Sequence, residues 1–385
     1  MLKNILVNFA GKGVSVLLSL ICIPLYIHFL GIEGYGEIGI FYTFMSVINM
    51  FSLGLAPIIT REMARNRESF ELLGMVEITY LVLGCGIILC AGEKFTWIMA
   101  LIIALQMLYC VYDAALMGMQ RQVQANVWNV VFAVIRAFGA FSPTLNIFFL
   151  WLAIVTLLQA VVFRCFLYRN FPKWNFPLLK QYKNMLLESS GNSILGQILT
   201  QIDKIVLIRM VSLEAFGYYC VASSICNSIS HVVFPVIQSF YPTFSEYFAL
   251  NRNVDAAYKF GMKILCFLVV PIGTVLCFFS KQILLLWTQN SVIAEHTYKI
   301  VILLSIAKTL EGMVQLPWSL TFAFGWRKGV LYQQFISLLI MVPSMIWAII
   351  HFGSLGACVV LIVINLGYLL IGVPMIHKRV LYARE

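Results

Sequence analysis

The sequence predicts an all-α protein that crosses a membrane many times, because both its composition and the spacing of its apolar segments are foreign to water-soluble domains. Of its 385 residues, 61% are hydrophobic and only 11% are charged, whereas a soluble domain carries about 25% charged residues. The hydrophobic residues come in segments of roughly 20, the length that a helix needs to cross a bilayer. A polytopic membrane protein is therefore expected.

We expect about twelve transmembrane helices, numbered here as spans one to twelve. They cover residues 5–29, 38–60, 71–91, 95–118, 126–143, 147–168, 188–210, 217–243, 260–286, 299–321, 329–350 and 355–376. Spans five and six are separated only by the sequence FSPTLN, which predicts a tight turn between two short helices.

The basic residues indicate how these spans are oriented. If the N-terminus is cytoplasmic, most of the 26 Lys and Arg residues fall on the cytoplasmic side, including clusters at 61–67, 169–183 and 378–384. Cytoplasmic loops of membrane proteins carry such an excess of positive charge. We therefore expect both termini to be cytoplasmic, and the net charge of +10 needs no nucleic-acid partner to explain it.

The chain contains an internal repeat. The sequence GIEGYG (31–36) recurs as SLEAFG (212–217), and GMVEITYLVLGCGIILC (74–90) aligns with GMKILCFLVVPIGTVLC (261–277). In each pair, the second copy follows the first at a distance close to half of the chain length. The spans therefore divide into two parallel six-helix repeats. The predicted limits are an N-terminal half at 1–169, a cytoplasmic linker at 170–187 and a C-terminal half at 188–385.

The glycines of LGIEGYGEIG (30–39) allow two interpretations, a phosphate-binding loop or a turn. No Gly-Lys-Ser/Thr follows them, their spacing differs from that of dinucleotide-binding loops, and no strand precedes them. Glycine also permits a sharp chain reversal. We expect a turn outside the membrane here, and a matching turn at 212–217.

Charged side chains inside the spans are the main candidates for function, because each costs about 2.5–3.5 kcal/mol at the centre of a membrane helix. Span one carries a polar stripe, at steps of three and four residues, that includes Asn8 and Lys12. A polar stripe cannot face lipid, so it lines a cavity or pairs with another helix. The other charges inside spans are Glu77, Asp113, Arg136, Asp203, Lys204, Lys308 and Glu311.

Each of these charges also has a structural interpretation. Lys308 and Glu311 lie three residues apart and could pair with each other. Asp113 could be the partner of Arg136, which has no acidic neighbour within one helical turn. Glu77, near one end of span three, could simply reach water.

The ten cysteines and five histidines show no spacing typical of a metal site. We therefore expect no metal and no cofactor. His231, within span eight, is a candidate for proton transfer because histidine titrates near neutral pH.

Several motifs give the chain a family resemblance. They are NFAGKG (8–13), Pro24 before a Leu-Gly-x-x-x-Tyr-Gly turn, and TREMAR (60–65) after span two. In these motifs the first seventy residues resemble the start of bacterial O-antigen and polysaccharide flippases of the Wzx type. Those proteins belong to the multidrug/oligosaccharidyl-lipid/polysaccharide exporter superfamily, and the repeat extends the resemblance to the whole chain. A MATE-like fold is implied.

The resemblance implies a flippase of the bacterial inner membrane rather than an enzyme. Such a protein moves a polyprenyl-pyrophosphate-linked oligosaccharide, an O-antigen, capsule or exopolysaccharide repeat unit, between leaflets by alternating access. Membrane lipids and other polysaccharide assembly proteins would be its partners, with no nucleic acid. The anionic headgroup would need polar and cationic groups, for which the candidates are Asn8, Lys12, Arg136, Lys204 and Lys308. Coupling to H⁺ or Na⁺ would use Asp113, Asp203 and Glu311.

Two other functions compete with the flippase. A multidrug antiporter of the same superfamily would share the fold and the repeat, but it binds cationic drugs and should carry acids where span one has Lys12. A membrane glycosyltransferase or polymerase generally needs a sizeable outer loop, and the longest outer stretch here is only 287–298. The sequence favours the flippase over both.

Overall fold

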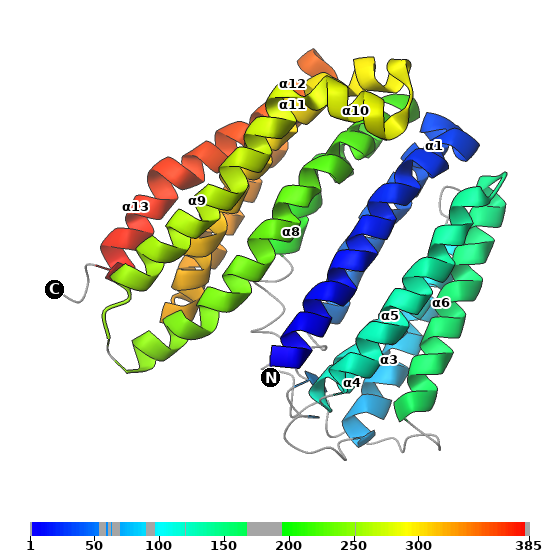
Figure 1. The fold of residues 1–385 in the computed structure, drawn as a ribbon, viewed down its shortest axis with the longest axis horizontal. Helices are drawn as coiled ribbons and strands as arrows, with labels where there is room; N and C mark the ends of the chain where they lie inside the picture. Colours follow the sequence, from blue (N-terminus) through cyan, green and yellow to red (C-terminus); the bar gives the residue numbers. More distant parts are fainter. Residues whose placement is uncertain are drawn as a thin grey trace. The chain divides into compact units, whose positions relative to one another are not determined.

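The computed structural model of the chain describes residues 2–53, 59–60, 63, 70–89, 97–119, 121–167, 195–250 and 252–381. Within these ranges every regular element is helical, and nine helices are long and apolar enough to cross a membrane. The prediction of an all-α, multi-pass membrane protein is confirmed. The chain forms two compact units, Met1–Ile198 and Leu199–Glu385, whose helices are drawn in Figure 1.

The first unit contains spans one to six. Its helices are α1 (Leu2–Leu53), α3 (Phe70–Leu89), α4 (Trp97–Gly118), α5 (Gln122–Ala137), the short 3₁₀ turn η1 (Phe138–Phe141) and α6 (Leu145–Leu167). Helix α4 packs against both α3 and α6 and forms the centre of the unit. The turn predicted at FSPTLN joins η1 to α6, and the Thr144 hydroxyl accepts a bond from the Ile147 N–H.

Gly31 divides α1 into two arms that reverse direction. Its φ of 75° and ψ of 175° are not helical and suit glycine. In a straight helix Tyr26 and Phe41 would lie about 22 Å apart. Instead their rings contact the adjacent residues Phe148 and Phe149 of α6, with centroids 5.3 and 5.4 Å apart. The predicted turn is confirmed, and it is concentrated at one residue rather than spread over a loop.

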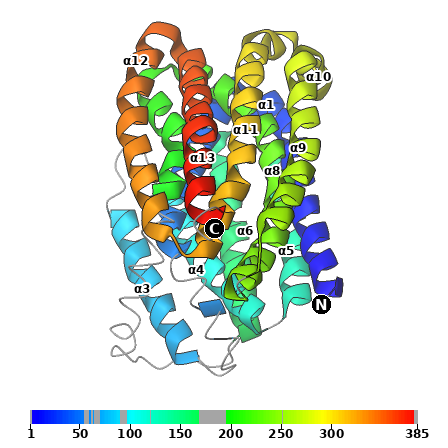
Figure 2. The ribbon, with the colours of Figure 1, turned by 90° about the vertical axis from the view of Figure 1, so that its left-hand side faces the viewer.

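The second unit contains spans seven to twelve. A helix at residues 195–210 crosses the boundary at Leu199. The unit continues through α8 (Leu213–Ala249), α9 (Asp255–Phe278), α10 (Ser280–Thr288), α11 (Ser291–Phe324) and α12 (Arg327–Gly367). The C-terminal turns are η2 (Tyr368–Gly372), α13 (Val373–Ile376) and η3 (His377–Leu381). Helix α11 packs against α8, α9 and α12; Figure 2 looks onto this part of the unit.

The repeated motif produces the same turn in both units. Gly31 aligns with Ser212, and Ser212 is the extended residue that precedes α8, with its hydroxyl accepting a bond from the Ala215 N–H. Gly353, with φ of 58°, interrupts α12 in a similar way. With these interruptions, a described helix overlaps each of the twelve predicted spans.

The predicted end of span nine is wrong. Span nine was expected to continue to residue 286, but α9 ends at Phe278 and α10 begins at Ser280. Phe279 has φ of −109° and ψ of 17°, which interrupts the helix. Neither glycine nor proline marks this site, so hydropathy could not locate it. The predicted linker at 170–187 lies outside the described residues, and the limits 1–169 and 188–385 stay predictions.

Candidate functional site

Five polar side chains of the first unit form a continuous set of hydrogen bonds, called here the first-unit network. The guanidinium of Arg136 donates to the Gln159 side-chain oxygen. The Gln159 amide donates to Asn129 Oδ1 at 3.1 Å, and Asn129 Nδ2 donates to Asp113 Oδ1 at 3.1 Å. The Tyr109 hydroxyl also donates to Asn129, at 2.6 Å. The network therefore joins a cation to a carboxylate through two neutral amides.

The helical repeat explains how three helices supply this network. Tyr109 and Asp113 lie one turn apart on α4, and Asn129 and Arg136 lie two turns apart on α5, so each pair shares a face. Gln159 on α6 is only 1% exposed and bridges the two pairs. Buried amides need such partners, and their neutrality made Asn129 and Gln159 inconspicuous in the sequence.

Arg136 is not directly paired with an acid in the described part of the chain. The predicted contact between Arg136 and Asp113 is replaced by the indirect route through the two amides. The Arg136 Nε atom is buried and has no hydrogen-bond partner among the described residues. Tyr26 and Tyr42, from the two arms of α1, lie close enough to interact electrostatically with it. Among the described residues, Arg136 thus has one donor without a partner and no direct contact with a neutralising carboxylate.

Glu77 occupies a separate ion pair of the first unit. Its carboxylate accepts bonds from Arg164 Nε at 2.7 Å and from the Tyr112 hydroxyl at 2.8 Å. Glu77 is only 7% exposed, so the expectation that it reaches water is wrong. The pair links α3, α4 and α6, which gives Glu77 a structural role that its position in the sequence did not reveal.

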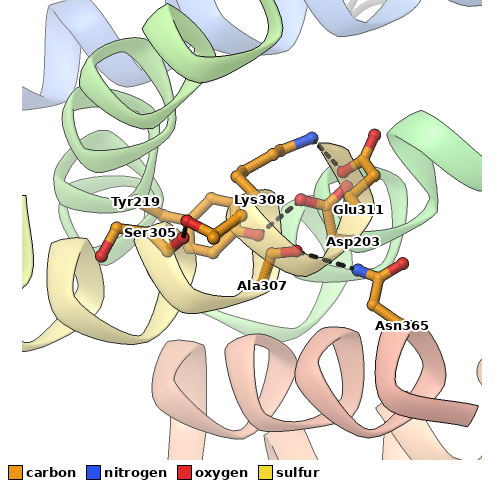
Figure 3. A network of polar contacts seen from close by, with 8 residues as sticks. Asp203, Tyr219, Ser305, Ala307, Lys308, Glu311 and Asn365 are labelled. Atoms are coloured by element: carbon orange, nitrogen blue, oxygen red, sulfur yellow. Dashed lines mark hydrogen bonds and ion pairs between the residues drawn. The ribbon is translucent and has the colours of Figure 1, made fainter. Parts of the chain in front are cut away.

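The second unit contains a compact charged cluster, formed by Asp203, Tyr219, Lys308 and Glu311 (Figure 3). Lys308 Nζ donates to Glu311 Oε2 at 2.8 Å, which confirms the predicted pair on α11. The Tyr219 hydroxyl donates to Asp203 Oδ2. Asp203 lies close enough to Lys308 to interact electrostatically with it. Residues 195–210, α8 and α11 therefore bring their polar groups to one place.

The charges of this cluster do not cancel. Two carboxylates face one ammonium group, so the fully ionised cluster carries one net negative charge. Asp203 is 7% exposed, and its Oδ1 is buried without a hydrogen-bond partner in the residues that the structure describes. Beside the cluster, the Asn365 amide donates to the Ala307 carbonyl at 3.2 Å. Uptake of one proton or one monovalent cation would neutralise the cluster.

The remaining predicted site residues are not assembled with these groups. Lys204 is half-buried, and across the described ranges it takes part in no ion pair or hydrogen bond, although it interacts electrostatically with Cys220. Asn8 and Lys12 belong to α1, but their side chains lie outside the described residues. Their roles stay predictions. No group of His, Cys, Asp and Glu side chains within the described parts is arranged to hold a metal ion.

The family model described as polysaccharide biosynthesis protein matches residues 1–248, which is more than half of the chain. The chain belongs to the polysaccharide biosynthesis protein family. The curated proteins contain no match to this family member.

Solved structures show which fold this polysaccharide biosynthesis family member has. It is similar to an inward-facing multidrug resistance MATE family transporter of the MOP superfamily, with a TM-score of 0.79 and 16% identity, covering 95% of this chain and 94% of that chain. The lipid II flippase MurJ gives a TM-score of 0.77 and 13% identity, covering 99% of this chain and 87% of that chain. An outward-facing MATE family transporter gives a TM-score of 0.67 and 15% identity, covering 97% and 94%. The predicted MATE-like fold is confirmed, and these relatives in fold are transporters rather than enzymes.

Proposed function

We propose that this protein is a flippase that moves a polyprenyl-pyrophosphate-linked oligosaccharide across the bacterial inner membrane by alternating access. Membership of the polysaccharide biosynthesis family favours a saccharide-bearing substrate, and the fold favours transport. The saccharide would be an O-antigen, capsule or exopolysaccharide repeat unit. Both termini would be cytoplasmic, and membrane lipids and other polysaccharide assembly proteins would be the partners.

The observation that carries the proposal is the environment of Arg136. Its guanidinium is held by the neutral Gln159, and no carboxylate contacts it among the described residues. A pyrophosphate carries negative charge and several acceptor oxygens, for which a positioned guanidinium is well suited. Arg136 is therefore the first candidate for contact with the headgroup.

The other proposed headgroup contacts are Asn8, Lys12, Lys204 and Lys308. Lys308 would have to exchange its present partner, Glu311, for the substrate. Lys204 needs no such exchange, because it forms no ion pair within the residues that the structure describes.

The charged cluster of the second unit suits coupling to H⁺ or Na⁺. Because it combines Asp203 and Glu311 with a single lysine, it gains stability when one further positive charge arrives. Asp113 of the first-unit network is the other proposed coupling carboxylate. Binding of an ion to one conformation more strongly than to another is what shifts a transporter between states.

The proposal is tested in cells that lack this gene and carry a plasmid copy. We expect surface polysaccharide to be restored by the unaltered chain, and lipid-linked single repeat units to accumulate without it. An Arg136→Ala copy should leave these units accumulating. Unchanged surface polymer and lipid-linked pools, with altered efflux of dyes or drugs, would instead support the multidrug antiporter.

A further inference from the structure

Helix α8 carries a polar face that the charged cluster does not use. This helix runs nearly the full length of the second unit (Figure 1). At about 100° per residue, Asn227, His231 and Gln238 lie within an arc of about 40°. The residues on the opposite side, such as Ile229 and Val233, are buried in the unit. Asn227, His231 and Gln238 are called here the α8 stripe.

The side chains of the α8 stripe are accessible and lack partners. His231 and Gln238 are exposed and Asn227 is half-buried. Throughout the described ranges, none of the three forms a side-chain hydrogen bond, unlike Ser239, whose hydroxyl donates to the Pro235 carbonyl. Amide groups without partners are not tolerated against lipid. This face of α8 is therefore not expected to lie against lipid, and water or a polar ligand would satisfy its amides.

Two prolines add hydrogen-bond acceptors to the same face. In an α-helix the N–H of each residue donates to the carbonyl four residues earlier. Proline has no N–H, so Pro235 and Pro242 deprive the carbonyls of His231 and Gln238 of their usual donors. Both freed carbonyls belong to stripe residues. The stripe therefore offers donors and acceptors together, without any full charge.

Aromatic rings border the α8 stripe. Phe234 and Tyr241 are 53% and 41% exposed, and their positions on the helix fall within the same face. A sugar ring presents hydroxyl groups at its edge and C–H groups on its faces. Neutral amides and carbonyls match the hydroxyl groups, and aromatic rings match the C–H faces.

We infer that the α8 stripe is the contact surface for the sugar residues of the transported lipid, separate from the cationic groups that would hold its pyrophosphate. This inference rests on the proposed function and assigns the uncharged part of the substrate to its own residues. The selectivity for one oligosaccharide over another would then depend on Asn227, His231 and Gln238.

The first test measures whether the stripe is hydrated. Asn227→Cys and Gln238→Cys variants in membranes are treated with a charged, membrane-impermeant methanethiosulfonate reagent, and labelling is measured above that of the unaltered chain. Phe267→Cys is the control, because Phe267 is 78% exposed on the apolar helix α9. We expect both stripe variants to react at least tenfold faster than the control. Equal, slow labelling at all three positions would overturn the inference.

The second test identifies the ligand. The probes are the lipid-linked oligosaccharides extracted from cells lacking this gene, and bare polyprenyl pyrophosphate at the same concentration. We expect the oligosaccharide lipid to slow labelling of Gln238→Cys at least fivefold and bare polyprenyl pyrophosphate to have little effect. Equal protection by the two would overturn the assignment to sugar, since their shared group is the pyrophosphate.

A transport control separates this inference from the proposed function. If the unaltered chain does not clear lipid-linked units from the deletion cells, the proposed function itself fails. If it clears them while neither lipid protects Gln238→Cys, only the stripe inference fails. A Gln238→Ala copy should clear the units at least fivefold more slowly than a Ser239→Ala copy, whose altered residue lies outside the stripe.

Discussion

At the scale of single residues, the first-unit network turns Arg136 into a positioned cation. Gln159 fixes the guanidinium without neutralising it, because an amide oxygen accepts a hydrogen bond but carries no full charge. Lys308 differs, since Glu311 compensates it directly. Two basic residues that looked equivalent in the sequence therefore have different capacities to bind an anion.

Replacing Arg136 by Gln should slow clearance of lipid-linked units at least tenfold, because it removes the charge and keeps much of the side-chain volume. Tenfold corresponds to about 1.4 kcal/mol, close to the lower end of what a hydrogen bond to a charged group contributes. The measurement is the lipid-linked pool in complemented deletion cells at matched protein levels. Arg252→Gln, at an exposed position, is the control; equal clearance by both variants would remove Arg136 from the site.

We expect the ion pair between Glu77 and Arg164 to stabilise the fold rather than to take part in transport. Replacing Glu77 by Gln removes the carboxylate that accepts from Arg164 Nε in a largely buried place, and should lower the free energy of unfolding by about 1–3 kcal/mol. Adding Arg164→Met should recover part of this loss, because the guanidinium that paired with Glu77 is then gone. Thermal unfolding is measured for the unaltered protein, both single variants and the double variant, which together form a double-mutant cycle. If the effects of the two changes were additive, Glu77 and Arg164 would not be energetically coupled.

At the scale of elements, the two repeats use different chemistry for one turn. Gly31 reaches its turn through a positive φ, whereas Ser212 uses an extended backbone and a hydroxyl cap. Gly31 and Ser212 differ, so the match between 31–36 and 212–217 depends on the residues that follow them. This match predicted both turns correctly. It could not predict that the turn would occupy so few residues, because that depends on how both α1 arms contact other helices, as in the ring contacts of Tyr26 and Phe41 with α6.

Gly31→Ala should destabilise the protein, because a side chain at φ of 75° costs about 1–2 kcal/mol. The space around Gly31 is open, so the cost comes from the backbone alone. Gly13→Ala is the matched control on the same helix, where the space is also open and φ is ordinary. We expect a lower unfolding temperature for the first variant and an unchanged or higher one for the second. Equal unfolding temperatures would contradict the role of Gly31.

At the scale of the whole molecule, composition and apolar spacing were sufficient to predict an all-α protein that crosses the membrane many times, because a spanning helix must be both long and apolar. The MATE-like fold was implied by the family resemblance. The hydrogen-bond partners of side chains within each unit could not be predicted in this way. Gln159 meets Asn129 across 30 positions of the chain, and Asp203 meets Tyr219 on another helix. Such contacts depend on helix rotation and on neutral side chains, neither of which charge counting detects. The α8 stripe could not be predicted from charge for the same reason, since Asn227 and Gln238 are neutral amides and His231 is its only titratable member.

The charged cluster of the second unit gives the last prediction, which concerns how the whole transporter is driven. Asp203→Asn removes one of its two carboxylates, and the remaining Lys308 and Glu311 then neutralise each other without a further cation. Transport in vesicles should become insensitive to an imposed H⁺ or Na⁺ gradient and should slow at least tenfold. Asp255→Asn is the control, because Asp255 forms an exposed ion pair with Lys259 and such pairs contribute little. If the Asp203→Asn variant kept the gradient dependence of the unaltered chain, coupling would have to use another carboxylate, for which Asp113 in the first-unit network is the remaining candidate.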